Sequence, residues 1–356
     1  MKKKNKLTIL GAGSTGMATA AYFSIGGCDV TLCDEAEQSA DFDVIRRQGG
    51  ILLRGASGRT GCAMPVRLTC DFREALEDAD RILVCTSAAR HKQIADRIAP
   101  LARPGQIFLL SPGNFGSFLF RQALQEQGKQ ETVVAELCGN LWACRRTAPA
   151  EVLIAMPMKE GVVSALPSKN TARVIAAFRD ILPLREGKNV LEVSMNSPNV
   201  ISHVAGAVMN ATQIERAGEQ FAFFRDGLGE SVIQSFVGLE QERNAVMEKL
   251  GLSVYGASSE TLMRTLMQPD CPKALRYFKT LDGPSGFSHR YVSEDAACGV
   301  AMIVSLGREY HIPTPLTEAF LAIAQWINHT DYVQNGCSLK NVGLSDLTVE
   351  QLMARL

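Results

Sequence analysis

Apolar runs alternate with helix-forming stretches through the first half of the chain. Short β-prone runs bounded by turn residues are typical of strands, and the stretches between them lack helix breakers. The pattern predicts strands at residues 7–10, 29–33, 81–85, 106–110 and 133–137, and helices at 17–23, 72–77 and 91–98. Strands that alternate with helices in this way predict a parallel sheet.

Residues 41–69 interrupt this alternation. Several glycines separate β-prone pieces such as residues 51–53, and the pattern predicts two short strands in an insertion. Beyond the insertion and the regular alternation, further strands are expected at 143–146 and 151–156. A helix is expected at 168–181, and residues 183–188 break it.

The strand pattern disappears after Val193. From Asn196 onward helical periodicity dominates, and helices are expected at 199–213, 230–250, 260–267, 294–310 and 316–326. A chain of 356 residues is long enough for two domains of ordinary size. We therefore expect domains at residues 1–190 and 191–356, the second of them all-helical.

A Gly-rich turn joins the first predicted strand to the first helix. Gly11, Gly13 and Gly16 form a G-x-G-x-x-G pattern, which gives a tight turn, an open approach for a pyrophosphate and close packing of helix on strand. The helix N-terminus adds N–H groups and a positive dipole end. The pattern predicts an α/β fold class with a Rossmann-type doubly wound sheet that binds a dinucleotide. The alternative is a Gly-rich loop in another kind of α/β domain.

An acidic residue ends the second predicted strand. Asp34 lies where a carboxylate can accept a hydrogen bond from an adenosine ribose and repel a 2′-phosphate. With Glu35 beside it, this residue favours NAD as cofactor. NADP stays open, because Arg46 and Arg47 are close enough in sequence for a loop to bring one back.

Two loops follow later strands at the expected carboxyl edge of the sheet, where ligands bind in open α/β folds. The first contains Thr86 and Ser87, and the second contains Gly113 and Asn114; the alternative is that both are ordinary turns. The residues predicted to contact the cofactor are Gly11, Gly13, Ser14, Thr15, Gly16, Asp34, Thr86, Ser87, Gly113 and Asn114.

Composition narrows the partners to small molecules. The 37 basic residues balance the 37 acidic ones, so no general field draws the chain to nucleic acid or to an acidic membrane. No apolar run approaches the roughly 20 residues of a membrane span, and a cytoplasmic protein is expected. The ten cysteines show no C-x-x-C spacing, which predicts reduced thiols and no metal site.

Polar residues on apolar elements are the candidates for chemistry. Asn199 and His203 are four residues apart on one helix face, with Asn210 two turns further on. A lone histidine on such a face is more often a core residue than a catalyst. Glu136 lies in an apolar strand, where a carboxylate is rare unless it is paired or functional. It is a candidate for substrate contact, and the alternative is an ion pair with Arg145.

Five segments together resemble the opine dehydrogenase family, whose members pair a Rossmann domain with an all-helical one. Departures are Val204 where a proline often follows the histidine, Leu137 where a threonine follows the strand glutamate, and Cys337-Ser338 in place of Arg-Thr. These departures leave the amino donor open. The resembling segments are Glu136 to Arg145, Asn199 to His203 with Asn210, Phe224-Arg225-Asp226-Gly227 through Glu240 to Arg243, Arg290 to Asp295, and Asn335 to Leu339 with Gly343-Leu344.

The resemblance implies a reductive condensation of an α-keto acid with the amino group of an amino acid, with NADH as reductant. It implies that His203 handles the proton and that Asp295 is its partner. Arg290 would bind the keto-acid carboxylate, and Asn199 would bind substrate or help fix the imidazole. Whether the chain forms a homodimer stays open.

Two other classes of protein remain as alternatives. A ketopantoate-reductase-like, 6-phosphogluconate-type or other 2-hydroxy-acid dehydrogenase has the same two-domain architecture, but the first two rely on a catalytic lysine early in the helical domain. No lysine occurs between Asn189 and Glu240. A dinucleotide sensor without enzymatic activity would need the Gly-rich turn but not His203 and Asp295 together.

Overall fold

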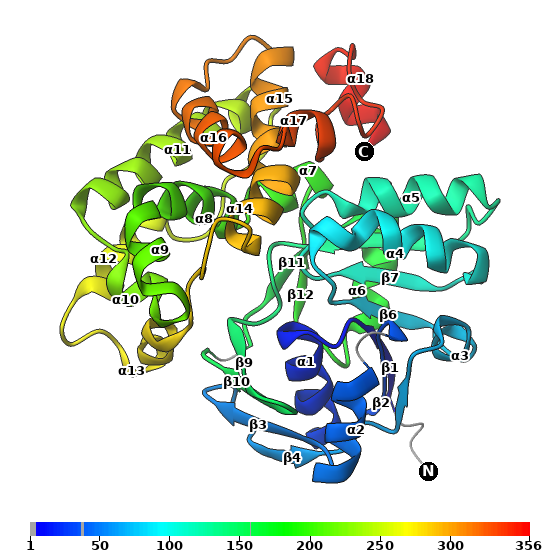
Figure 1. Cartoon of the computed structure of the whole chain (residues 1–356). Helices are drawn as coiled ribbons and strands as arrows, with labels where there is room; N and C mark the ends of the chain where they lie inside the picture. Colours follow the sequence, from blue (N-terminus) through cyan, green and yellow to red (C-terminus); the bar gives the residue numbers. More distant parts are fainter. Residues whose placement is uncertain (1–4, 37–38, 157) are drawn as a thin grey trace. The chain divides into compact units, whose positions relative to one another are not determined.

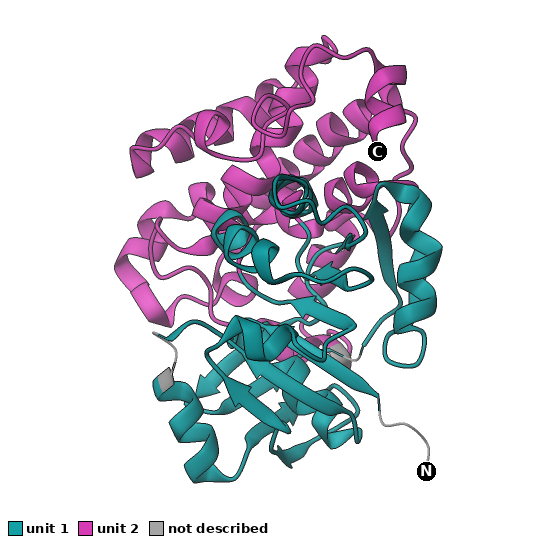
Figure 2. Cartoon of the chain, turned by 90° about the vertical axis from the view of Figure 1, so that its right-hand side faces the viewer, with its two compact units in different colours: residues 1–86, 90–113, 117–187 teal, residues 87–89, 114–116, 188–356 magenta. Residues whose placement is uncertain are grey.

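The computed structural model describes residues 5–36, 39–156 and 158–356, and the chain forms two compact units (Figure 2). Unit 1 extends to Thr86 and also contains the segments Arg90–Gly113 and Ser117–Gly187. Unit 2 contains Lys188–Leu356 together with two short loops, Ser87–Ala89 and Asn114–Gly116. Both loops follow strands of unit 1 along the chain, yet their contacts place them in unit 2.

Unit 1 is built on a large sheet of eight strands, counted over the described ranges, in the order β12-β11-β8-β7-β6-β1-β2-β5 (Figure 1). The six strands from β8 to β5 are parallel, whereas β11 runs antiparallel to β8. The predicted Rossmann-type doubly wound sheet is therefore confirmed. The strands are β1 (Lys6–Leu10), β2 (Asp29–Cys33), β5 (Arg67–Thr69), β6 (Arg81–Val84), β7 (Ile107–Leu110), β8 (Val133–Leu137), β11 (Gly161–Leu166) and β12 (Leu184–Glu186).

Helices cover both faces of this sheet, because successive side chains of each strand point to opposite faces. Leu109 of β7 packs in one core with residues of α1 and α6, whereas its neighbours Phe108 and Leu110 pack in the other with α3, α4 and α5. Alternate side chains of one strand therefore pack into two different apolar cores, one on each face of the sheet. These helices are α1 (Ser14–Ile25), α3 (Phe72–Leu76), α4 (His91–Ile98), α5 (Gly116–Glu126) and α6 (Thr171–Phe178).

A second, four-stranded sheet packs against α1 in the order β4-β3-β10-β9. The expected insertion therefore holds β3 and β4, but it also holds an unpredicted helix, α2, and β5, which joins the large sheet. Of the two strands expected near residues 143–156, β10 pairs with β3 and β9 pairs with β10, so both join the small sheet and not the large one. The bounds are α2 (Ser39–Gln48), β3 (Ile51–Gly55), β4 (Gly61–Ala63), β9 (Cys144–Ala148) and β10 (Glu151–Ile154).

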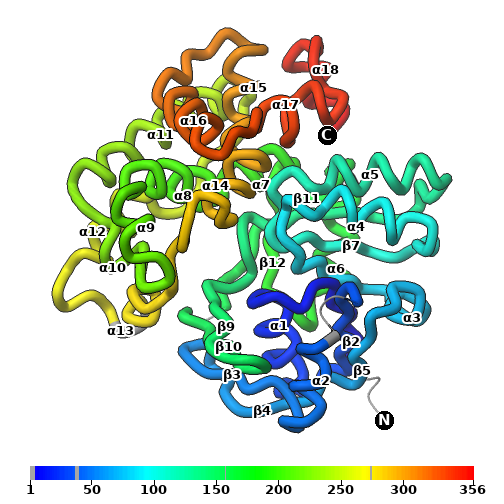
Figure 3. The backbone as a smooth tube through the Cα atoms, viewed as in Figure 1, coloured from blue at the N-terminus to red at the C-terminus, as the bar shows by residue number. Residues whose placement is uncertain are grey.

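Every regular element in the described part of unit 2 is a helix, which confirms the predicted all-α region (Figure 3). Helix α8 is central, since α11, α14 and α16 all contact it, and its side chains from Val200 to Ala207 are buried. The helices are α7 (Val190–Met195), α8 (Pro198–Met209), α9 (Ala211–Ala217), α10 (Phe223–Asp226), α11 (Glu230–Lys249), α12 (Ser259–Met267), α13 (Lys273–Arg276), α14 (Arg290–Asp295), α15 (Ala301–Glu309), α16 (Pro315–Asn328), α17 (Tyr332–Asn335) and α18 (Val349–Arg355).

Two of the predicted helices are interrupted. Helix α8 ends at Asn210, whose side-chain amide donates to the carbonyls of Gly206 at 2.8 Å and Gly227 at 2.9 Å. The helix expected at 294–310 contains a π-turn over Ala296–Val300, in which Cys298 has non-helical φ −111° and ψ 26°. Gly299 lies in this turn and faces Val200 of α8, where an added Cβ would come within 2.8 Å of that side chain. Glycine at this position therefore allows the π-turn to lie close against α8.

Carboxylates of α11 fix the starts of two other helices. Glu240 accepts from the Ser259 backbone at 2.9 Å, at the start of α12. Glu242 accepts from the N–H groups of Leu316 and Thr317, each at 2.8 Å, at the start of α16. An anion at a helix N-terminus is favourable because it satisfies N–H groups that have no partner within the helix.

Neither a membrane segment nor a metal site is found in the parts that the structure describes. No helix there is both long and apolar enough to cross a bilayer. No group of three or more potential metal ligands among His, Cys, Asp and Glu occurs in the same ranges.

Candidate active site

The Gly-rich turn of unit 1 has the geometry of a phosphate cradle. Gly11 has a positive φ of 103°, and a Cβ at Gly16 would lie 1.7 Å from the Gly11 carbonyl oxygen. A Cβ at Gly13 would meet nothing within 4 Å, so the turn is open there, and no side chain caps the N-terminus of α1. These residues fit a dinucleotide pyrophosphate placed at the start of α1.

Asp34 ends β2 and is buried. Its carboxylate accepts hydrogen bonds from the Glu35 N–H at 2.8 Å and from the N–H of Ala12 in the Gly-rich turn. The carboxylate therefore also fixes the conformation of that turn. Lone pairs on its two oxygens leave capacity for a ribose hydroxyl as well.

The other predicted cofactor residues of unit 1 contact the same turn or pack beside it. The Ser14 hydroxyl accepts from the Arg146 N–H at 3.2 Å, and Thr15 Oγ1 lies 3.9 Å from the thiol of Cys144 in β9. A Cβ at Gly11 would lie 3.0 Å from Thr86, so Thr86 borders the turn. The structure thus brings Gly11, Ser14 and Thr15 close to Thr86 or to β9.

Glu136 is fully buried in β8. Its carboxylate accepts from the Ser117 N–H at 2.7 Å, at the start of α5. An added Cβ at Gly113 would lie 2.5 Å from Glu136 Cβ, so only glycine fits beside this side chain. Gly113 thus has a packing role whether or not it contacts a cofactor, and substrate contact by Glu136 stays a prediction.

In unit 2, the structure pairs the two residues predicted to be catalytic. His203 Nδ1 lies 2.8 Å from Asp295 Oδ2, although 92 residues separate them in sequence. Helices α8 and α14 supply one residue each, and the side chains are only 4% and 1% exposed. A carboxylate at Nδ1 favours the tautomer with the proton on that atom, which leaves Nε2 to exchange protons.

Aromatic rings fix the plane of the imidazole. Tyr291 stacks on His203 with 3.5 Å between ring centroids and 8° between planes. Phe223 presents its edge to both rings, at 6.3 Å from His203 and 5.7 Å from Tyr291. The Phe223 ring fits against Gly206, where an added Cβ would come within 2.2 Å of it. Tyr291 was not predicted, although it lies four residues before Asp295 and hence on the same face of α14.

Arg290 and Asn199 lie near this pair along the same two helices. Arg290 is half-buried as the first residue of α14, and its guanidinium carbon lies 5.4 Å from the centre of the Tyr291 ring. Asn199 is half-buried on α8, one turn before His203. Arg290 also places a positive charge near the carboxyls of Glu294 and Asp295, where it partly opposes the rise in pKa that burial causes.

Two adjacent buried carboxyls end α14, and only one of them was predicted. Burial raises the pKa of Glu294 to about 7 and that of Asp295 to about 7, and Arg290 opposes both shifts. A hydrogen bond from the backbone N–H of Ala88 also opposes the rise in the pKa of Glu294. One oxygen of each carboxyl, Glu294 Oε2 and Asp295 Oδ1, is buried without a hydrogen-bond partner. These oxygens leave acceptor capacity within the site.

Asn114 and Ser87, predicted to contact the cofactor, lie in the loops that belong to unit 2. The Asn114 side chain is close enough to Asp295 to lower the pKa of that carboxyl. Both atoms of its buried amide nevertheless lack a hydrogen-bond partner at normal length. The structure therefore associates Asn114 with Asp295, and its contact with the cofactor stays a prediction.

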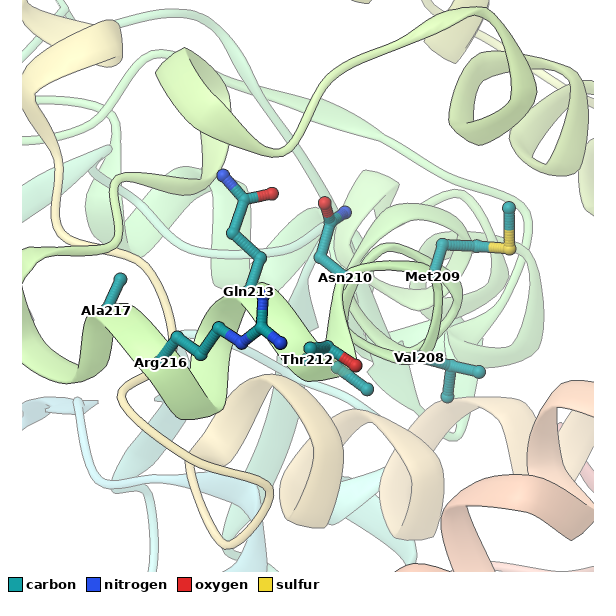
Figure 4. A pocket seen from close by; sticks show the side chains of 8 residues that line it. Val208, Met209, Asn210, Thr212, Gln213, Arg216 and Ala217 are labelled. Atoms are coloured by element: carbon teal, nitrogen blue, oxygen red, sulfur yellow. The ribbon is translucent and has the colours of Figure 1, made fainter.

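A surface cavity of about 540 Å³ lies at the end of α8 and along α9 (Figure 4). Its only charged lining side chain is Arg216, and Asn210 already donates its amide to two carbonyls. None of the residues predicted for catalysis or cofactor binding lines it. The cavity is formed by Val208, Met209, Asn210, Ala211, Thr212, Gln213, Arg216 and Ala217.

Comparisons with known proteins find relatives for both parts of the chain. Residues 186–328 match the family described as NAD/NADP octopine/nopaline dehydrogenase, alpha-helical domain, and residues 7–162 match ketopantoate reductase PanE/ApbA. An opine dehydrogenase of Arthrobacter sp. (strain 1C) is 30% identical over 361 residues, which cover 98% of this chain and 98% of that protein.

Solved structures share the fold. Octopine dehydrogenase with NADH and L-arginine has a TM-score of 0.71 at 15% identity, with 98% of each chain covered. Yersinopine dehydrogenase with NADP⁺ bound has a TM-score of 0.64 at 14% identity, covering 100% of this chain and 98% of that one. A PanE/ApbA family ketopantoate reductase from Ralstonia eutropha JMP134 has a TM-score of 0.62 at 18% identity, covering 91% of this chain and 98% of that one.

The raised pKa of Glu294 predicts a pH-dependent effect of Glu294→Gln on stability. The unfolded chain releases this proton near the ordinary pKa and the folded chain near 7, so the stability that protonation provides is lost as the pH rises through that window. We expect the variant to gain about 1–3 kcal/mol relative to the wild type at pH 8 compared with pH 5. Denaturant unfolding at both pH values measures this gain. Glu350→Gln, at an exposed glutamate, is the control, and equal gains in the two variants would contradict the prediction.

Proposed function

This chain belongs to the opine dehydrogenase family of NAD(P)-dependent oxidoreductases that act on CH–NH bonds, and we propose that His203 and Asp295 form its catalytic pair. The proposed reaction is the reversible reductive condensation of an α-keto acid with the amino group of an amino acid. The buried 2.8 Å contact between His203 Nδ1 and Asp295 Oδ2 supports this proposal. It fixes Nδ1 of the histidine against a carboxylate, and we propose that Nε2 is the atom that exchanges the proton.

The Gly-rich turn and Asp34 fit the cofactor. Gly13 leaves room for the pyrophosphate, the N-terminus of α1 offers N–H groups to it, and Asp34 would accept from a ribose hydroxyl. The bound nicotinamide supplies the hydride. The chain's own residues bind the two substrates and move protons between them.

His203 carries the proton steps in this proposal. Condensation of a keto acid with an amine requires a neutral amine, and Nε2 of His203 can accept the proton that the ammonium must lose. The same atom can return a proton when water leaves the carbinolamine. Asp295 stabilises the imidazolium between these steps, and the Tyr291 ring keeps the imidazole in one plane.

Arg290, Asn199 and Glu136 are proposed to bind substrate. A guanidinium matches a carboxylate bidentately, so Arg290 suits the keto-acid carboxylate. Asn199 lies one turn before His203 and can donate to or accept from a polar substrate group. Glu136 keeps a carboxylate in a fully buried position beside Gly113, and we propose that it contacts substrate.

A ketopantoate-reductase-like activity is the alternative, since residues 7–162 match that family. That match covers the dinucleotide-binding region and not the helices with His203 and Asp295. The absence of lysine between Asn189 and Glu240 argues against it. A dinucleotide sensor is disfavoured because nothing in that role calls for a buried histidine–carboxylate pair.

The first prediction from the proposed function is that NADH oxidation requires a keto acid and an amino acid together, because their imine accepts the hydride. A screen of keto acids crossed with amino acids, followed by absorbance at the nicotinamide band, measures this directly. Matched reactions without the amino acid serve as controls. A full rate with a keto acid alone would favour a 2-hydroxy-acid dehydrogenase.

The second prediction is that His203 and Asp295 act as one unit. His203→Ala should lower kcat by about 100- to 10,000-fold, because the proton carrier is lost. Asp295→Asn presents the wrong partner to Nδ1, and the double variant should be scarcely slower than His203→Ala. NADH binding, measured by fluorescence titration, should stay near the wild-type value. Multiplicative losses, or near-normal turnover of His203→Ala, would show that the histidine is a core residue.

We also propose that two copies of the chain associate through α16. Ala319, Ala322, Ile323, Trp326 and Ile327 are exposed at helical spacing and carry no charge, and Trp326 is 82% exposed. An antiparallel two-fold pairing would set each Trp326 against the small Ala319 of the other copy. Light scattering should find a dimer that Trp326→Arg dissociates, whereas Tyr277→Arg should leave it intact. A monomeric wild type would rule the pairing out.

A further inference from the structure

A buried glutamate beside Asp34 holds two arginines of unit 1. The Glu35 side chain is 6% exposed and forms ion pairs with Arg90 and Arg97. Its carboxylate also accepts from the amide of Gln93 at 3.1 Å. We call these four residues the Glu35 cluster. The single negative charge of Glu35 balances only one of the two positive charges, so the Glu35 cluster keeps a net positive charge.

The Glu35 cluster lies at the place in the fold that receives the adenosine ribose. Glu35 follows Asp34 directly at the carboxyl end of β2, and Arg90 and Arg97 lie in the segment after β6. Strand β1 lies between β2 and β6 and leads into the Gly-rich turn, so all three strands end at one sheet edge.

Both arginines keep part of their surface accessible. The side chain of Arg90 is 35% exposed and that of Arg97 is 47% exposed, in contrast to the buried Glu35 between them. The Arg97 guanidinium carbon lies 4.8 Å from the centre of the Phe72 ring, which covers one of its faces. The Phe72 ring and the Glu35 carboxylate together fix the orientation of the Arg97 guanidinium, and therefore also the direction of the N–H groups that Glu35 does not bind.

Asp34 alone gives an incomplete account of cofactor choice. Its carboxylate already accepts from the N–H groups of Ala12 and Glu35, so it has a structural role in the turn. Arg46, which the sequence suggested as a phosphate ligand, is exposed on α2 and pairs with Asp43 at 2.9 Å. The arginines that pair with Glu35, the residue directly after Asp34, are instead Arg90 and Arg97.

We propose that Glu35 determines the preference for NADH over NADPH by occupying Arg90 and Arg97, which together form a latent site for a 2′-phosphate. Guanidinium groups bind phosphate oxygens bidentately, and two of them can compensate for the negative charge of Asp34. With Glu35 in place, each guanidinium gives part of its donor set to that carboxylate, whose own charge repels the phosphate. The inference rests on the cofactor site of the proposed function.

Glu35→Gln tests the proposal, because it removes the charge and keeps the shape. Calorimetry on the full chain, without keto acid or amine, gives dissociation constants for NADH, NADPH, AMP and adenosine 2′,5′-bisphosphate. We expect NADPH and the bisphosphate to bind roughly tenfold more tightly than to the wild type, since a repulsive charge is lost and two arginines are released. NADH and AMP should change by less than about threefold.

Further variants separate release of the arginines from simple loss of charge. Adding Arg97→Met to Glu35→Gln should cancel most of the gain for the bisphosphate. Glu151→Gln is the matched control, since it breaks the exposed Arg54–Glu151 pair of the same unit, 2.9 Å long, and should change no affinity. If Glu35→Gln does not fold, Glu35→Asp keeps the charge but shortens its reach, and a smaller gain in bisphosphate affinity is expected.

Three results would overturn the proposal: unchanged bisphosphate affinity in the folded Glu35→Gln or Glu35→Asp variant, a gain that survives Arg97→Met, or a wild type that already binds NADPH as tightly as NADH. None of these measurements involves turnover. A protein that lacks the proposed condensation activity could still show the gain, and an active enzyme could lack it. The two proposals therefore fail independently.

Discussion

The hydrogen bond between His203 and Asp295 is the interaction around which the helical unit is arranged. A carboxylate removed from water loses its hydration and must regain hydrogen bonds and opposite charge from the protein. Asp295 obtains a hydrogen bond from the imidazole and opposite charge from the nearby Arg290, and the Asn114 side chain lies beside it. Helix α8 and helix α14 must therefore lie against each other at this point, and Gly206 and Gly299 permit the close packing of Phe223 and Val200 around it.

A different constraint governs the dinucleotide-binding unit, where backbone must approach backbone. Gly16 lies so close to the Gly11 carbonyl that a side chain at Gly16 would clash with it. Asp34 accepts a hydrogen bond from the Ala12 N–H of the same turn. Helix α1 is then covered on one side by the large sheet and on the other by the small one. Buried flanking elements and the buried bond from Ala12 to Asp34 thus fix the conformation of the turn.

Local patterns were enough to predict most of unit 1 and the helical nature of unit 2. The strands around the Gly-rich turn, Asp34 at the end of β2 and the spacing of Asn199 and His203 all depend on short stretches of sequence. Pairing between distant segments was missed: β10 joins β3 across about a hundred residues, and no local signal distinguishes that partner from the large sheet. The π-turn at Cys298 was also missed, because its residues have ordinary helical composition.

The candidate site shows the same division between local and distant information. His203 and Asp295 were predicted through resemblance, but Tyr291, Phe223 and Glu294 became evident only when the helices were placed together. Asn114 was expected at the cofactor, and the fold associates it with Asp295. Arg90 and Arg97 carried no sequence signal, since their significance depends on Glu35, more than fifty residues earlier in the chain.

The two loops that belong to unit 2 have a consequence for how such proteins can change in evolution. The helical unit is completed by residues 87–89 and 114–116, which are encoded within the dinucleotide-binding half of the sequence. A recombination event that exchanged only residues 188–356 would leave residues 87–89 and 114–116 behind. The incoming counterparts of Glu294 and Asp295 would then contact loops from a different protein. The helical unit is therefore not contiguous in sequence, and we expect its loops and helices to change together.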